Sequence, residues 1–129
     1  MKYNELLGQV QHRGRMSSRR EAERAVEATL STLSARLAGG AAENLAAQLP
    51  PEAQEYLQGG ERAEELSVGE FLASVGQRAG IDDADSAWQT RVVLEVLQEA
   101  VSAGTLDKLR AQLPEEFDAL FKAGSAGEL

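Results

Sequence analysis

The sequence has no cysteine among its 129 residues. This absence excludes disulfide bonds, zinc sites built on thiolates and cysteine nucleophiles. A chain of this length can bury one ordinary hydrophobic core without covalent cross-links, so we expect one domain that spans residues 1–129. The lack of disulfides is compatible with a cytoplasmic location, which is the location we expect.

Histidine is nearly absent and occurs only as His12. A metal site normally needs several such ligands, and a catalytic histidine needs a nucleophile and a carboxylate that converge on it. We therefore expect His12 to be solvated at a helix end rather than functional. The sequence also lacks a glycine-rich phosphate-binding loop and a GxSxG motif. We expect no enzyme activity and no bound cofactor or metal.

Long apolar runs are missing as well. No stretch approaches the roughly 18 apolar residues that a membrane-spanning helix needs, and the first residues lack the apolar segment of a signal peptide. We therefore expect an unexported protein without a membrane partner.

Basic residues are fewer than acidic ones, 13 against 21, which gives a net charge of −8. This charge disfavours non-specific binding to nucleic acids or anionic membranes. Basic side chains nevertheless gather near the start of the chain, at Arg13, Arg15, Arg19 and Arg20. This basic corner surrounds a predicted helix N-terminus, where free N–H groups also attract anions. It is a candidate contact for phosphate, a nucleic-acid backbone or an acidic protein, and the alternative is a solvated corner. Aromatic residues make up only 5%, which is too few for a stacking platform and disfavours nucleic acid.

Acidic residues gather at Asp82, Asp83 and Asp85. This segment lacks the glycine and the distal glutamate of an EF-hand loop, so we interpret it as the capped first turn of a helix. The corner at residues 78–85 is acidic, whereas the corresponding corner at residues 13–20 is basic. The two corners could attract each other within one molecule or between molecules, and we expect any such weak self-association to depend strongly on salt.

The most informative pattern is a duplication. Ala47-Gln48-Leu49-Pro50 returns as Ala111-Gln112-Leu113-Pro114, 64 positions later. Apolar residues recur at helical spacing and no strand-like alternation appears, so the fold class is predicted to be all-α. We expect two tandem repeats of about four helices each, at residues 3–58 and 67–122, joined by a linker at 59–66 and followed by a flexible tail at 123–129. Each repeat alone would bury too little surface, so the two should share one core.

Helix boundaries follow from local signals. The first helix is predicted over residues 3–13 and ends at Gly14, and a long second helix starts after a capping box at Ser18 and ends at Gly39-Gly40. Short helices are predicted over residues 41–49 and 51–58, with a sharp corner at the intervening prolines. Another capping box, at Ser67, begins the second repeat.

The long helix of the second repeat has a broad apolar arc that includes Trp88 and Val92. A helix with such an arc is usually central and contacts several neighbours. The alternative is that Trp88 and Val92 mark an exposed surface for a partner. The corresponding positions in the first repeat are the charged residues Glu23 and Glu27.

Several of these sequence patterns together resemble those of a known family. The doubled Leu-Leu-x-x-Val pattern of the first helix, the alanine-rich second helix and the Ala-Gln-Leu-Pro corner are similar to the bacterial family called domain of unknown function 2267. The segment Leu113-Pro114-Glu115-Glu116-Phe117 is the more typical copy, whereas Pro51 and Ala53 depart from the pattern in the first repeat. The resemblance implies an all-helical bacterial protein, and it carries over no activity and no catalytic residue.

From these observations we expect a non-enzymatic module for protein interaction or regulation, whose partner is an unknown protein or a second copy of the chain. The alternative is a protein that binds a small ligand or anion, either at the basic corner or in a cavity between the repeats. A pocket with convergent polar groups would favour the binder of ligands, whereas a flat apolar patch including Trp88 would favour the adaptor.

Overall fold

The computed structural model describes residues 1–37, 40–58 and 65–124. These residues form eight α-helices and two short 3₁₀ helices without any strand, so the all-α prediction is confirmed. The helices are α1 (Tyr3–Gly14), α2 (Arg19–Arg36), α3 (Ala41–Ala46), α4 (Pro51–Gln54), η1 (Glu55–Leu57), α5 (Val68–Ala79), α6 (Asp83–Ala100), α7 (Ala103–Ala111), η2 (Glu115–Phe117) and α8 (Asp118–Ala123).

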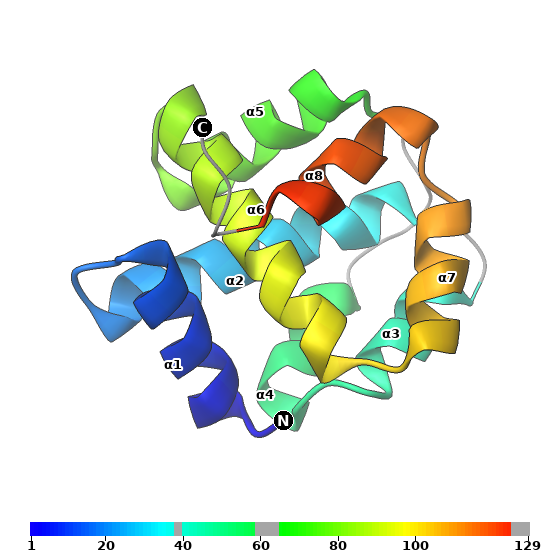
Figure 1. The fold of residues 1–129 in the computed structure, drawn as a ribbon, viewed down its shortest axis with the longest axis horizontal. Helices are drawn as coiled ribbons and strands as arrows, with labels where there is room; N and C mark the ends of the chain where they lie inside the picture. Colours follow the sequence, from blue (N-terminus) through cyan, green and yellow to red (C-terminus); the bar gives the residue numbers. More distant parts are fainter. Residues whose placement is uncertain (38–39, 59–64, 125–129) are drawn as a thin grey trace.

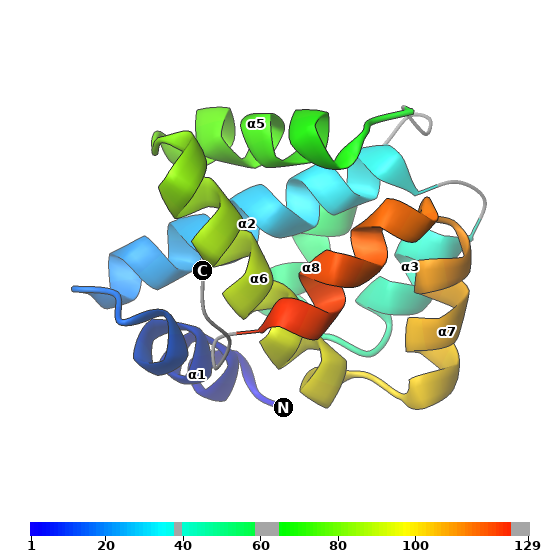
Figure 2. The same cartoon turned by 45° about the horizontal axis from the view of Figure 1, so that its top comes forward.

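The two longest helices, α2 and α6, lie at the centre of the molecule, and α1 and α5 lie beside them, so that the two halves of the chain interleave (Figures 1 and 2). Helix α1 packs on α2 and also on α6, while α5 packs on α6 and also on α2. The short helices α3 and α7 lie side by side at one end. Each half therefore covers part of the other.

The buried side chains of both halves form a single hydrophobic cluster. Its largest fully buried members include Leu7 and Leu30 from the first half and Phe71 and Leu97 from the second. Phe71 and Phe117 meet edge to face with ring centres 5.4 Å apart, a favourable arrangement of aromatic quadrupoles. The predicted shared core is therefore present.

Side-chain caps begin the long helices where the sequence predicts them. Ser18 Oγ accepts a hydrogen bond from the N–H of Glu21, and Asp82 Oδ1 accepts one from the N–H of Asp85. The capping box at Ser67 is complete, because the Glu70 carboxylate also accepts from the Ser67 N–H. The box at Ser18 is only half formed, since Glu21 Oε1 accepts from Ser17 instead.

Four predicted helix ends differ from the structure by a few residues, among them that of α2, which ends at Arg36 rather than at Gly39-Gly40. Helix α1 includes Gly14, and Arg15 adopts the left-handed conformation with φ 53°. Helix α3 ends at Ala46, and α4 gives way to the 3₁₀ helix η1 after Gln54. Because the ring of Pro50 disfavours helical geometry at Leu49, the last residues before it form a hydrogen-bonded turn.

The two halves have helices of matching length, since α1 and α5 have 12 residues each and α2 and α6 have 18 each. This order agrees with the predicted tandem repeat, which itself stays a prediction. Most of the predicted linker at 59–66 and of the predicted tail at 123–129 lies outside the described residues, which do not include 59–64 and 125–129. Gly39, at the predicted end of the second helix, also lies outside them. Ala123 was predicted to be in the tail but is the last residue of α8.

Candidate functional site

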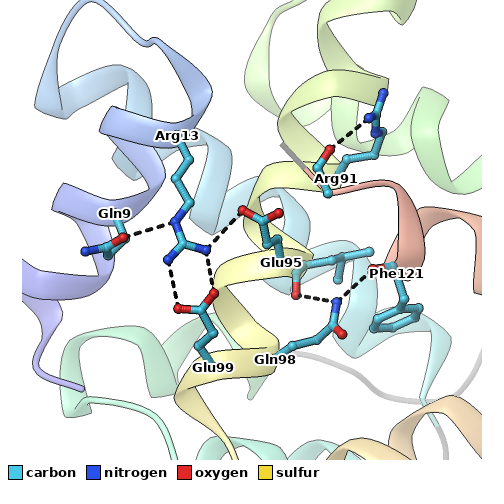
Figure 3. A network of polar contacts seen from close by, with 9 residues as sticks. Gln9, Arg13, Arg91, Glu95, Gln98, Glu99 and Phe121 are labelled. Atoms are coloured by element: carbon cyan, nitrogen blue, oxygen red, sulfur yellow. Dashed lines mark hydrogen bonds and ion pairs between the residues drawn. The ribbon is translucent and has the colours of Figure 1, made fainter. Parts of the chain in front are cut away.

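Arg13 from the predicted basic corner is engaged inside the protein (Figure 3). Its guanidinium makes two parallel contacts with Glu99, Nη1 to Oε2 at 2.6 Å and Nη2 to Oε1 at 2.8 Å, and Nη1 also donates to Glu95 Oε2 at 3.0 Å. Its Nε donates to Gln9 Oε1 at 3.0 Å. The hydrogen bonds from Arg13 hold the pKa of the Glu99 carboxyl below its usual range. Arg13 therefore joins α1 to α6 instead of facing an external anion.

Trp88 and Val92 do not form an exposed partner surface. Val92 is 0% exposed and belongs to the core. Trp88 is half-buried, and its Nε1 donates a hydrogen bond of 2.9 Å to the Gly14 carbonyl. Met1 is the only large hydrophobic side chain classed as exposed in the part of the chain that the structure describes. The interpretation of the apolar arc as the centre of the bundle is correct.

The other arginines of the basic corner diverge. Arg19 Nη2 donates to Asn4 Oδ1 at 2.8 Å. Arg15 lines a shallow hollow with His12, and Arg20 lines a different one. Both His12 and Arg15 are exposed. The corner is therefore not one convergent anion site, although its segment 17–20 does border the hollow described next.

A polar groove runs along the exposed side of α2. Three surface hollows of about 320, 490 and 430 Å³ follow one another there, and neighbouring hollows share lining residues such as Arg24, Glu27 and Arg78. We call this feature the α2 groove. Its lining comprises Ser17 and Ser18 before α2, residues Arg20, Glu21, Arg24, Glu27, Ala28, Ser31, Ser34 and Ala35 of α2, Glu55 and Tyr56 of η1, residues 77–81 at and just after the end of α5, and Gln89 of α6.

The groove lies between the two halves of the chain, because its lining comes from α2 of the first half and from α5 of the second. These two helices lie side by side (Figure 2). It also brings the corners at residues 13–20 and 78–85 to one hollow, where Ser18 and Arg20 lie near Gly80 and Ile81. None of the ion pairs formed by the described residues joins these two corners.

Three exposed arginines, Arg20, Arg24 and Arg78, give the groove its basic character. None of them has a carboxylate within ion-pair distance among the described residues. The carboxylates of Glu27 and Glu55 line the groove toward its other end. The groove therefore has a basic part and an acidic part, in a protein whose net charge is −8.

Tyr56 lines the acidic part of the groove and contacts α1 through its hydroxyl. Its hydroxyl lies 3.2 Å from the hydroxyl of Tyr3 on α1. Burial, together with the hydrogen bond to Tyr56, raises the pKa of Tyr3 above its ordinary value, so the Tyr3 phenol is neutral at physiological pH. The hollow that Tyr56 and Arg78 line is also lined by the small side chains Ser31, Ser34 and Ala35.

The lining of the groove suits the recognition of charged groups. It combines guanidinium groups, carboxylates, serine hydroxyls and a tyrosine, and it contains no histidine. The described part of the chain contains no group of three or more histidine, aspartate or glutamate residues arranged to hold a metal ion. The groove is thus arranged for binding through ion pairs and hydrogen bonds.

Comparison with models of protein families shows to which family the chain belongs. A family model described as "Uncharacterized conserved protein (DUF2267)" matches residues 3–120. The chain belongs to this family. A search of the curated proteins found no match. In this member of the DUF2267 family, none of the helices in residues 1–37, 40–58 and 65–124 has both the length and the apolar character needed to cross a membrane.

Sequence reasoning missed Arg24 and Arg78 as groove residues. Arg24 lies on α2 one turn after Arg20, so helical spacing alone places both on one side. Arg78 lies 54 residues further along the chain than Arg24, and only the packing of α5 on α2 brings the two together. The corner at residues 78–85 corresponds in the sequence to the corner at residues 13–20, and this correspondence is the signal that could have found Arg78.

Proposed function

We propose that this protein is a non-enzymatic binding module that acts in the bacterial cytoplasm and holds a partner protein in the α2 groove. The observation that carries the proposal is the presence in the groove of three arginines without ion-pair partners among the described residues. Unpaired guanidinium groups at a surface are strong donors to carboxylates and can bind them in a bidentate manner.

The character of the surface supports a polar mode of binding. The apolar positions Val92 and Trp88 are taken up by the core and by α1, so an apolar docking patch around them has no support. The hollow between the halves is lined by convergent polar groups instead. Electrostatic complementarity of this kind gives specificity and fast association more than high affinity, which suits a regulatory module.

A second candidate function is the binding of a small anion at the basic end of the groove. There Arg20 and Arg24 border a hollow of about 320 Å³ together with Ser17 and Ser18. Phosphate is the simplest such anion, and titration with inorganic phosphate, followed by nuclear magnetic resonance of the Ser17 and Ser18 amides, tests this candidate. Saturable shifts confined to this hollow would favour it over the docking of a partner protein.

The main proposal is tested by comparing two charge-reversal variants. Arg24→Glu changes the groove, whereas Arg15→Glu changes an equally exposed arginine outside it. The tagged proteins are used to capture partners from a lysate of the native host, and circular dichroism checks that both variants fold. We expect wild type and Arg15→Glu to retain a partner that Arg24→Glu loses. Retention of the same proteins by all three would contradict the proposal.

A further inference from the structure

Arg13 and Arg78 occupy the same position in two helices of equal length. Each is the eleventh of twelve residues, Arg13 in α1 and Arg78 in α5. In both cases Nε is hydrogen-bonded to the side chain four residues earlier, at 3.0 Å to Gln9 and at 3.4 Å to Ser74. In each arginine, this bond leaves Nη1 and Nη2 available for a group on or near the neighbouring long helix.

The long helix beside Arg13 is α6 and the long helix beside Arg78 is α2, and the two differ at the positions equivalent to Glu95 and Glu99. Arg13 on α1 meets Glu95 and Glu99, which are the thirteenth and seventeenth of the eighteen residues of α6. The thirteenth and seventeenth of the eighteen residues of α2 are Ser31 and Ala35. Arg78, Ser31 and Ala35 line the same hollow of about 430 Å³.

Arg78 thus has the setting of Arg13 without carboxylates at the two equivalent positions of the long helix, and Glu27 and Glu55, which line the same hollow, form no ion pair with it. No residue in the described ranges accepts a hydrogen bond from Nη1 or Nη2 of Arg78. At the two positions where α6 carries glutamates, α2 carries a serine and an alanine.

We propose that this hollow receives two carboxylates from an acidic helical segment of the partner protein, spaced four residues apart like Glu95 and Glu99. The inference rests on the proposed function and names the chemistry that the groove recognises. Arg78 binds one carboxylate through both Nη atoms, as Arg13 binds Glu99. Ser31 Oγ donates to the second carboxylate, and Arg24 lies next along the groove for a further acidic group.

The shape of the groove favours a protein segment over a free dicarboxylate. Small-ligand sites usually bury most of the ligand in one enclosed pocket. Here three adjoining hollows extend along α2, and their arginines and serines are spread over several helical turns. Glu27 and Glu55 border the hollow beside Arg78, so the segment should carry a basic side chain next to its acidic pair.

The test uses a fluorescein-labelled alanine-rich helical peptide of about 15 residues, a length that forms a helix in water. It carries a Glu pair four residues apart with a Lys beside the pair, and the matched peptide carries a Gln pair with the same Lys. Fluorescence anisotropy at low salt measures binding. We expect wild type to bind the Glu peptide and not the Gln peptide, and Arg78→Gln to weaken binding at least about tenfold, since a charge-assisted hydrogen bond contributes about that factor.

Two further variants sharpen the test. The double variant Ser31→Glu/Ala35→Glu copies Glu95 and Glu99 onto α2, so its own carboxylates should occupy Arg78 and reduce peptide binding at least about as much as Arg78→Gln does. Arg15→Gln removes an exposed arginine outside the groove and should bind like wild type. Thermal unfolding followed by circular dichroism confirms that each variant is folded before its binding is compared.

Equal binding of the Glu and Gln peptides, or unchanged binding by Arg78→Gln, would overturn the inference. Competition by free glutarate at concentrations as low as those of the peptide would show that a small dicarboxylate is the ligand, and it would overturn the assignment to a partner protein. If Arg78→Gln still captures a partner that Arg24→Glu loses, the carboxylate inference fails while the proposed function stands.

Discussion

Single side chains of α6 hold both ends of the chain to the centre of the molecule. Glu95 and Glu99 bind Arg13 of α1, and Gln98 Nε2 donates to the Phe121 carbonyl of α8 at 3.0 Å (Figure 3). Arg91 Nη2 donates to the Gly124 carbonyl at 2.8 Å, just past the end of α8. At the residue scale, α6 is therefore the helix to which the terminal helices are attached.

The pairing of Arg13 with Glu99 predicts a dependence of stability on acid. The hydrogen bond from Arg13 lowers the pKa of Glu99 in the folded state, so the ionised carboxylate stabilises the fold above its unfolded-state pKa of about 4.3. This stabilisation is lost as the pH falls through the folded-state pKa. Glu99→Gln should cost about 1 kcal/mol at pH 7, since the carboxylate is partly exposed and screened. Urea unfolding at pH 7 and pH 3 should show that wild type loses more stability than the variant.

A matched control separates this effect from the general loss of negative charge. Glu65→Gln removes an exposed carboxylate without a hydrogen-bond partner among the described residues, so its loss on acidification should equal that of wild type. Equal losses for wild type and Glu99→Gln would contradict the assignment.

At the scale of elements, helix starts are secured partly by distant segments. The N–H of Val68 at the start of α5 donates to Glu116 Oε1 at 2.9 Å, and the N–H of Ser102 before α7 donates to Gln48 Oε1 at 2.7 Å. Free N–H groups at a helix start need such acceptors. Gln48 belongs to the repeated Ala-Gln-Leu-Pro segment, so this segment both forms a corner and connects the two halves.

The capping box of α5 gives a prediction for stability. Ser67 Oγ accepts from the Glu70 N–H at 3.1 Å, and Glu70 Oε1 accepts from the Ser67 N–H at 2.9 Å. Ser67→Ala should lower the free energy of unfolding by about 1 kcal/mol, whereas Ser67→Asp, which keeps an acceptor, should change it little. Urea denaturation measures both. A cost as large for Ser67→Asp as for Ser67→Ala would show that the cap is not the source of the loss.

At the scale of the whole molecule, the halves cannot be separated without exposing the core. Helix α1 packs on α6 and α5 packs on α2, so each half buries apolar side chains of the other. Arg78 joins Arg24 in the α2 groove only because α5 lies against α2. Folding and the proposed binding surface therefore depend on the same contacts between the halves.

This interleaving predicts cooperative unfolding of the full chain. Calorimetry should show one transition whose van't Hoff and calorimetric enthalpies agree. Fragments 1–58 and 65–129 should each lack stable helical structure by circular dichroism, because about 60 residues with half of the core exposed bury too little surface. Mixing the two fragments should restore part of the helical signal. A fragment that melts cooperatively by itself would contradict the shared core.

The sequence by itself determined the all-α class, the starts of α2, α5 and α6, and the sharp corner at Pro50, because these features depend on contacts within a few residues. A capping serine and its acceptor are neighbours in the chain at Ser67 and Glu70, so their pairing can be read directly. Only the tertiary structure decided that Arg13 is paired while Arg78 faces a hollow, and that Val92 is buried. These outcomes depend on which long helices pack together, and that choice follows from burial of apolar surface by residues far apart in the chain.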